Sequence, residues 1–179
     1  MTRQQSLHSV NLQALASSGE PLIEHTLLQK LERLAQECIG LQPELMVDWQ
    51  AEAELRAGAA GQTDIWLHLQ AATSVPMTCQ RCMGAAKTPL QVDQWYRFVA
   101  SEDIAMAQDD ASEEDLLVLA PQFDLLALLE DELLMALPLV PMHDECPMLP
   151  AFSAGTIDVP ADALDKPNPF AALAQLKKK

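Results

Sequence analysis

Four side chains in this 179-residue sequence are of types that could together hold a metal ion. Cys79 and Cys82 form a Cys-x-x-Cys pair, and His143 and Cys146 form a His-x-x-Cys pair much further along the chain. Two thiols separated by two residues can chelate one metal ion from a single turn, and structural zinc normally takes four protein ligands. The second pair follows a proline-rich exit from an expected helix, from where it could fold back over that turn. Zinc is therefore one candidate for these four residues.

The same cysteines allow two other interpretations. They could be idle thiols at a turn, with Cys82 partly buried, or they could form a redox dithiol. A thioredoxin-type dithiol needs its motif between a strand and a helix, whose N-terminus lowers the pKa of the first thiol. Here residues 83–89 lead into an expected strand, which argues against an oxidoreductase. Zinc and idle thiols both stay open.

Other patterns typical of catalysis are missing from the sequence. The six glycines are scattered, so no phosphate-binding loop is predicted, and no serine lies in a nucleophile-elbow pattern. The acidic run of residues 130–132 occupies neighbouring helical positions that point in different directions, which favours a solvated face over a cation site. We predict no catalytic and no cofactor-binding residues.

The elements around the cysteine pair predict an α+β fold. Apolar and polar residues alternate over 45–55, 65–69 and 90–98, which is typical of strands with one wet face. Residues 74–79 could form a short additional strand that Pro76 would restrict to an edge or a bulge. Short turns separate these segments, so we expect an antiparallel sheet of about four strands within residues 44–99.

Two helices should pack on this sheet, and a third is allowed. Leucines at three- and four-residue spacing predict a helix near residues 25–39, and a second near 125–137 would begin at the N-cap Asp124 and end at Pro138. Residues 101–115 are acidic and weakly patterned, which predicts a mobile loop. We expect one α+β domain over residues 1–144 and a loose, proline-spaced extension over 145–179 that contains a short amphipathic segment.

Charge limits the class of partner. The chain has 26 acidic and 11 basic residues, a formal net charge of −15. Nucleic-acid binding depends on Lys and Arg displacing counterions from phosphates, so a broad RNA or DNA footprint is not expected. An acidic surface instead attracts basic proteins, although the same charge could simply keep the protein soluble.

The sequence also indicates a compartment. It contains no run of about 18 apolar residues that could span a membrane, and its N-terminus lacks the apolar stretch of a secretory signal. Four cysteines are too few for a disulfide framework in a chain of this length. We expect a cytoplasmic protein without membrane contact.

Several sequence blocks resemble the YceD family, the large ribosomal RNA subunit accumulation proteins of bacteria. The blocks are Cys79–Cys82, Phe123–Leu126 with Glu130–Glu132, Leu137–Asp144, and Asp165–Phe170 with Leu173, Leu176 and Lys177. The resemblance implies a role in the synthesis, processing or stability of 23S ribosomal RNA, in a family not known for nuclease or modifying activity. Some relatives carry a richer cysteine cluster after the proline-flanked helix, where this sequence has only Cys146.

Together these observations predict a non-enzymatic ribosome-biogenesis factor. Because the chain is so acidic, we expect it to contact a basic ribosomal protein or assembly factor and to reach large-subunit RNA indirectly. One alternative is a zinc-stabilised module that binds RNA directly, and another is a dithiol redox protein.

The end of the chain contains a candidate docking motif. An extended Pro-Asn-Pro entry precedes an apolar stripe and a basic end, a design that suits a helix lying in a partner's groove. The stripe could equally close over the protein's own sheet. The candidate residues are Lys166, Asn168, Phe170, Leu173 and Leu176.

Overall fold

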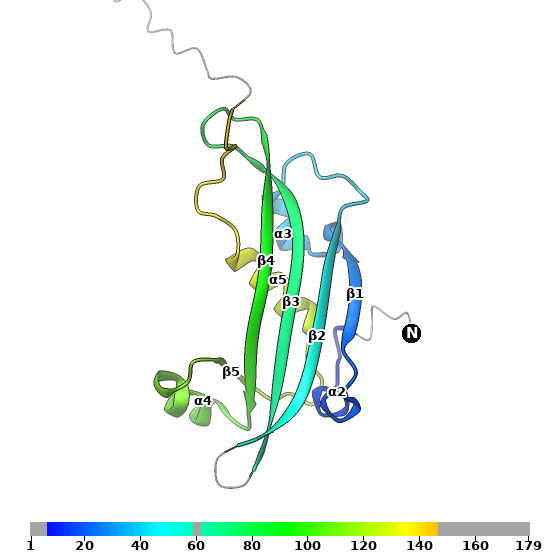
Figure 1. The fold of residues 1–179 in the computed structure, drawn as a ribbon, viewed down its shortest axis with the longest axis vertical. Helices are drawn as coiled ribbons and strands as arrows, with labels where there is room; N and C mark the ends of the chain where they lie inside the picture. Colours follow the sequence, from blue (N-terminus) through cyan, green and yellow to red (C-terminus); the bar gives the residue numbers. More distant parts are fainter. Residues whose placement is uncertain (1–6, 59–61, 147–179) are drawn as a thin grey trace, which may run out of the picture. The chain divides into compact units, whose positions relative to one another are not determined.

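A five-stranded, mostly antiparallel sheet organises the computed structural model, which describes residues 7–58 and 62–146 (Figure 1). The strands lie in chain order, and the first four are antiparallel neighbours, while the last pairs in parallel with β4. They are β1 (Leu22–Leu27), β2 (Met46–Ala57), β3 (Thr63–Thr78), β4 (Ala85–Val99) and β5 (Asp115–Val118). The predicted α+β fold with a mainly antiparallel sheet is confirmed.

The predicted alternation sets the two faces of the sheet. Register places Ala53, Leu67 and Tyr96 side by side on β2, β3 and β4, and all three are buried. Residues one position away in each strand point to the opposite face because side chains alternate along a strand. The inward-facing residues of this alternating pattern form the sheet's side of the hydrophobic core.

The expectation of a separate short strand at residues 74–79 was wrong, because β3 runs through Pro76 without a break. Pairing of β3 with β2 ends at Ala72, so Pro76 has only β4 as a neighbouring strand. The Pro76 carbonyl accepts a hydrogen bond from the Ile39 N–H at 2.9 Å, on the side away from β4. The nitrogen of a strand residue faces the same side as its carbonyl, so the missing N–H of proline breaks no ladder bond here.

Three helices bury their apolar residues in the core, and Figure 1 shows α3 and α5 behind the sheet. They are α2 (Leu12–Ser18), α3 (Glu32–Glu37) and α5 (Leu125–Met135). Leu125, Leu129 and Leu133 of α5 are fully buried, and the predicted N-cap Asp124 accepts from the Ala127 N–H at 2.8 Å. No helix in the described part of the chain is long and apolar enough to cross a membrane.

The predicted helix over residues 25–39 was wrong in its first half. Residues 22–27 form β1, and a short 3-10 turn, η1 (Leu28–Lys30), separates it from α3. Thr26 is buried and its hydroxyl accepts a hydrogen bond from Trp49 Nε1 at 2.9 Å, from the neighbouring strand β2. Pairing with β2 therefore overrides the helical leucine spacing, a competition between local and tertiary interactions that a single segment cannot reveal.

The expectation of a mobile loop over residues 101–115 was also wrong. The segment contains α4 (Glu102–Gln108) and the 3-10 turn η3 (Asp109–Ala111), and it leads into β5. Arg97 on β4 donates to Glu114 at 2.6 Å, Gln108 at 2.9 Å and Ser112 at 2.8 Å. One half-buried guanidinium thus organises a segment that has too few apolar residues to form a core of its own.

Glu130 is not part of a solvated face, as the acidic run had suggested. It is 9% exposed, and its carboxylate accepts from the N–H groups of Arg33 at 2.8 Å and Leu34 at 3.2 Å, and from Arg33 Nε at 2.9 Å. Because α3 has no side-chain cap of its own, Glu130 of α5 caps its first turn from outside.

The described residues reach Cys146, within the first compact unit of the chain, Met1–Met148. The second unit, Leu149–Lys179, lies outside the described residues, and so do all five candidate docking residues of the C-terminal motif.

Candidate metal centre

The turn between β3 and β4 positions the first cysteine pair. The Cys79 N–H donates to the Gly84 carbonyl at 2.8 Å, and the Met83 N–H donates to the Cys79 carbonyl at 2.9 Å. Met83 closes the turn with a φ of 61°, in the left-handed region. Cys79 and Cys82 therefore lie on one tight loop at the end of the two longest strands.

The segment after α5 returns to this loop. The Gln80 N–H donates to the Pro141 carbonyl at 2.9 Å, and His143 Nε2 lies 2.8 Å from the Ala85 carbonyl. Arg81 donates to the carbonyls of His143 at 2.8 Å and Asp144 at 3.2 Å. Backbone contacts thus place the His-x-x-Cys pair against the Cys-x-x-Cys loop.

All four predicted ligands meet there, with their donor atoms within 4.8 Å of one another. Cys79 Sγ lies 3.7 Å from Cys146 Sγ, and His143 Nδ1 lies 3.4 Å from Cys82 Sγ and 3.9 Å from Cys146 Sγ. A tetrahedral zinc ion with Zn–S of ~2.3 Å and Zn–N of ~2.0–2.1 Å separates its ligand atoms by about 3.5–3.8 Å. The three separations given above are close to this range, so the four side chains could hold a zinc ion.

The histidine is held in the orientation that such a site needs. Its Nε2 can donate to the Ala85 carbonyl, which leaves the lone pair of Nδ1 facing the thiols. A hydrogen bond from the second ring nitrogen to a backbone carbonyl is a common means of fixing a metal-binding histidine.

The cluster also favours a thiolate. Burial opposes ionisation of Cys79, but backbone N–H groups of His143, Cys82 and Arg81 together lower the pKa of Cys79 to about 5. The same contacts act on the imidazole, because hydrogen bonds to Cys79 and Cys146 raise the pKa of His143. The Gly84 N–H favours the Cys82 thiolate, yet burial and the neighbouring thiols outweigh it and raise the pKa of Cys82.

Arg81 is the residue that the sequence prediction missed. Its Nε lies 2.9 Å from Cys146 Sγ, and this hydrogen bond raises the pKa of the guanidinium. Three thiolates, one neutral imidazole and one Zn²⁺ would carry a net charge of −1, which Arg81 would balance. Its position between Cys79 and Cys82 was the only feature of the sequence that could have indicated this role.

The remaining cysteine lies apart from this cluster. Cys38 is half-buried, and its thiol donates to the Leu34 carbonyl at 3.3 Å. Burial raises the pKa of Cys38. Cys38 is therefore a packing residue.

A family model described as "Large ribosomal RNA subunit accumulation protein YceD" matches residues 67–177, more than half of the chain and all four cluster residues. This chain belongs to the YceD family. A curated YceD protein of that name from Haemophilus influenzae strain Rd is 37% identical over 107 residues, which cover 59% of this chain and 61% of the relative. The match therefore spans less than two thirds of that YceD protein. No solved structure matches the chain.

Proposed function

We propose that this YceD chain is a non-enzymatic factor that supports the accumulation of large-subunit, 23S ribosomal RNA in the cytoplasm. Family membership is the observation that carries this proposal, because the relative's name states such a role. Non-catalytic action is supported by the cluster: protein side chains would fill all four positions around a tetrahedral ion, whereas catalytic zinc keeps one position for water.

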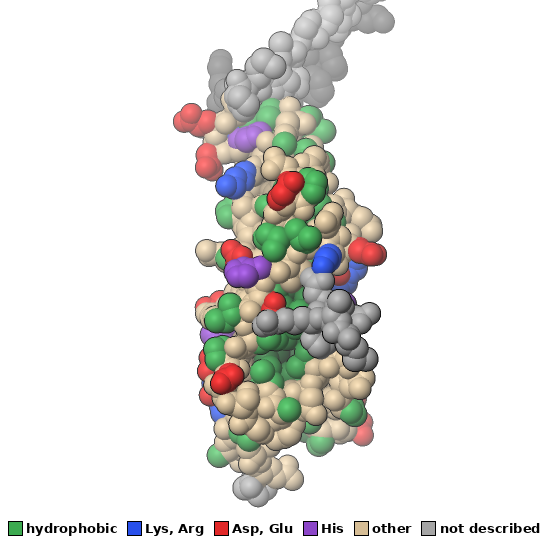
Figure 2. Space-filling view, turned by 90° about the vertical axis from the view of Figure 1, so that its right-hand side faces the viewer, with side chains coloured by type: hydrophobic (Ala, Val, Ile, Leu, Met, Phe, Trp, Pro, Cys, Tyr) green, Lys and Arg blue, Asp and Glu red, His purple; other side chains and the backbone are tan. Residues whose placement is uncertain are grey.

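The charge of the chain supports indirect contact with RNA through a basic ribosomal protein or assembly factor. A net charge of −15 repels phosphates at long range and attracts basic proteins. Figure 2 looks onto the β1 side of the molecule and shows few lysines and arginines there.

The main alternative is direct RNA binding by a zinc-stabilised module. Arg81 and Lys87 line a groove beside the cluster, which gives this alternative some support. Asp144 and Glu145 line the same groove and offset that positive charge. We therefore favour a basic protein partner.

A redox role has less support. Cys79, the thiol with the lowered pKa, is fully buried, whereas an attacking thiol must reach its substrate. The loop that carries it joins two strands instead of leading into a helix.

Depletion of the protein in its host tests the role. We expect 23S RNA to fall relative to 16S RNA and to recover when the wild-type chain is supplied. An unchanged ratio would overturn the proposal. Affinity capture with and without ribonuclease addresses the partner: basic proteins that stay bound after digestion support indirect contact, and naked ribosomal RNA bound by purified protein at physiological salt contradicts it.

The C-terminal motif at Lys166–Leu176 is a second proposed contact for the same partner. Deleting residues 166–179 should leave the melting temperature unchanged and abolish capture of the partner. A lower melting temperature would indicate that the segment packs on its own domain.

A further inference from the structure

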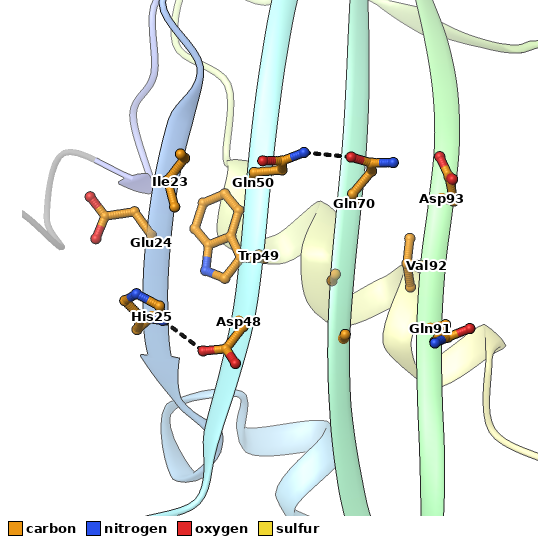
Figure 3. A pocket seen from close by; sticks show the side chains of 12 residues that line it. Ile23, Glu24, His25, Asp48, Trp49, Gln50, Gln70, Gln91, Val92 and Asp93 are labelled. Atoms are coloured by element: carbon orange, nitrogen blue, oxygen red, sulfur yellow. Dashed lines mark hydrogen bonds and ion pairs between the residues drawn. The ribbon is translucent and has the colours of Figure 1, made fainter.

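One face of the sheet is uncovered in the described part of the chain. α2, α3 and α5 contribute to the core on the opposite side, and no described helix packs over the centre of β2 and β3 on the uncovered side. We call this surface the open face. Figure 3 views it directly, with α5 behind the strands.

The open face contains a shallow hollow of about 440 Å³ that crosses β1 to β4 (Figure 3). Register places Ala72 of β3 between Asp48 of β2 and Gln91 of β4, and its short side chain leaves the floor open. Polar side chains surround this floor, namely His25, Asp48, Gln50, Gln70, Gln91 and Asp93. Adjacent strands are ~4.8 Å apart, so β2 and β4, which carry Asp48 and Asp93, lie about 10 Å apart across the hollow.

Three open-face carboxylates have no Lys or Arg partner among the described residues: Asp48, Glu52 and Asp93. Asp48 and Asp93 pair with His25 at 2.6 Å and His68 at 2.5 Å, and their side chains stay 71% and 68% exposed. Hydrogen bonds from His68 and Gln70 lower the pKa of Asp93, so it stays charged at neutral pH. The rim of the hollow is negative and accessible.

Next to the hollow, the open face already holds a guanidinium. The Cζ atom of Arg56 lies 4.3 Å from the ring centroid of Trp66 and 4.2 Å from that of Trp95, and Arg56 also pairs with Glu54. His68 stacks on Trp95 with centroids 4.2 Å apart and extends this aromatic surface toward the hollow. Planar cations are held well by aromatic faces flanked by carboxylates.

From this hollow, its rim of exposed carboxylates and the adjacent aromatic surface, we infer that the open face binds an arginine-rich segment of a partner protein. This inference deepens the proposed function, on which it rests, because it names the surface that would contact a basic partner. RNA fits the same surface poorly, since its phosphates would face the carboxylates.

Titration of the purified full chain with a fluorescent nine-residue arginine-glycine peptide tests the inference. The open-face variant neutralises the three carboxylates, Asp48→Asn, Glu52→Gln and Asp93→Asn. A matched control removes the same charge from exposed sites elsewhere, Glu20→Gln, Glu37→Gln and Glu44→Gln.

We expect the open-face variant to weaken peptide binding about tenfold or more, and the control about twofold, because local pairs contribute more than distant screened charges. Ala72→Phe, which fills the hollow without changing charge, should also weaken binding. Equal losses in both triple variants, undiminished binding by Ala72→Phe, or no binding by the wild type would overturn the inference. So would tighter binding of a uridine oligonucleotide that the open-face variant loses.

The titration tests the binding surface and the depletion experiment tests the cellular role, so one can be refuted without the other. If the peptide does not bind the open face but 23S RNA still falls on depletion, the inferred binding surface is refuted and the proposed role is supported. If the peptide binds the open face and 23S RNA is unchanged on depletion, the proposed role is refuted and the inferred binding surface is supported.

Discussion

Cys79 and Cys146 are 67 residues apart in the sequence, yet their Sγ atoms lie 3.7 Å apart. Backbone hydrogen bonds hold their two segments together, so the separation between the thiols does not depend on their own attraction. A site already arranged by the fold binds a metal without a large rearrangement.

We predict that the untagged protein contains about one zinc ion per chain and that Cys146→Ser loses it. The variant should also melt at a lower temperature, because binding to the folded state is a source of stability. Metal analysis and thermal unfolding measure both effects. Cys38→Ala, which changes a thiol outside the cluster, is the control and should keep its zinc; a metal-free wild type would contradict the prediction.

Arg81 should matter for metal affinity without binding the metal. Arg81→Ala removes the hydrogen bond to Cys146 and should weaken zinc binding about tenfold to a hundredfold in competition with a chelator. Lys87→Ala removes an exposed positive charge from the same groove and should have a much smaller effect. Equal losses in the two variants would mean that only overall charge matters.

The metal-free protein should be stabilised by the Cys79–His143 pair within a limited pH range. The lowered pKa of Cys79 means that its contribution is lost as pH falls through about 5, and the raised pKa of His143 means that its contribution is lost as pH rises through that pKa. Unfolding in the presence of a chelator, compared with Cys79→Ala across pH, measures the difference. A difference that does not change between pH 4 and 8 argues against the pair.

Glu130 should be a major link between α5 and α3. Glu130→Ala leaves two backbone N–H groups of α3 without their acceptor and should lower the free energy of unfolding by about 2–3 kcal/mol. Asp131→Asn is the control, because Asp131 is exposed and, among the described residues, its carboxylate pairs with the side chain of Arg33 and caps no backbone N–H, so we expect little change. Similar losses in denaturant unfolding would show that the ion pair, and not the cap, is responsible.

Strands were easier to predict than the segments that border them. Apolar and polar residues alternate so regularly along β2 and β4 that one face of each strand is apolar, independently of the neighbouring elements. β1 and α4 lack such a pattern: β1 depends on pairing with β2, and the α4 segment depends on Arg97 reaching Glu114. Interactions of this kind join residues that no local window contains.

The candidate ligands could be chosen from the sequence because thiol and imidazole groups at chelating spacing are rare in a chain with four cysteines and four histidines. Whether the four ligands meet depends on the path of the chain. The length of β3 and β4 places the Cys79–Cys82 loop, and residues 138–146 come back to that loop. Arg81 and the open face could not be assigned a role until neighbouring strands and carbonyls were in place.

By itself, the sequence determined the alternating strands, the types of the four donor groups and the acidic character of the chain, because each is a property of composition or of short-range spacing. Only the tertiary structure decided that the donors meet, that Glu130 is buried and that one face of the sheet is uncovered. These three features arise from contacts between distant segments, whose free energies depend on the whole fold.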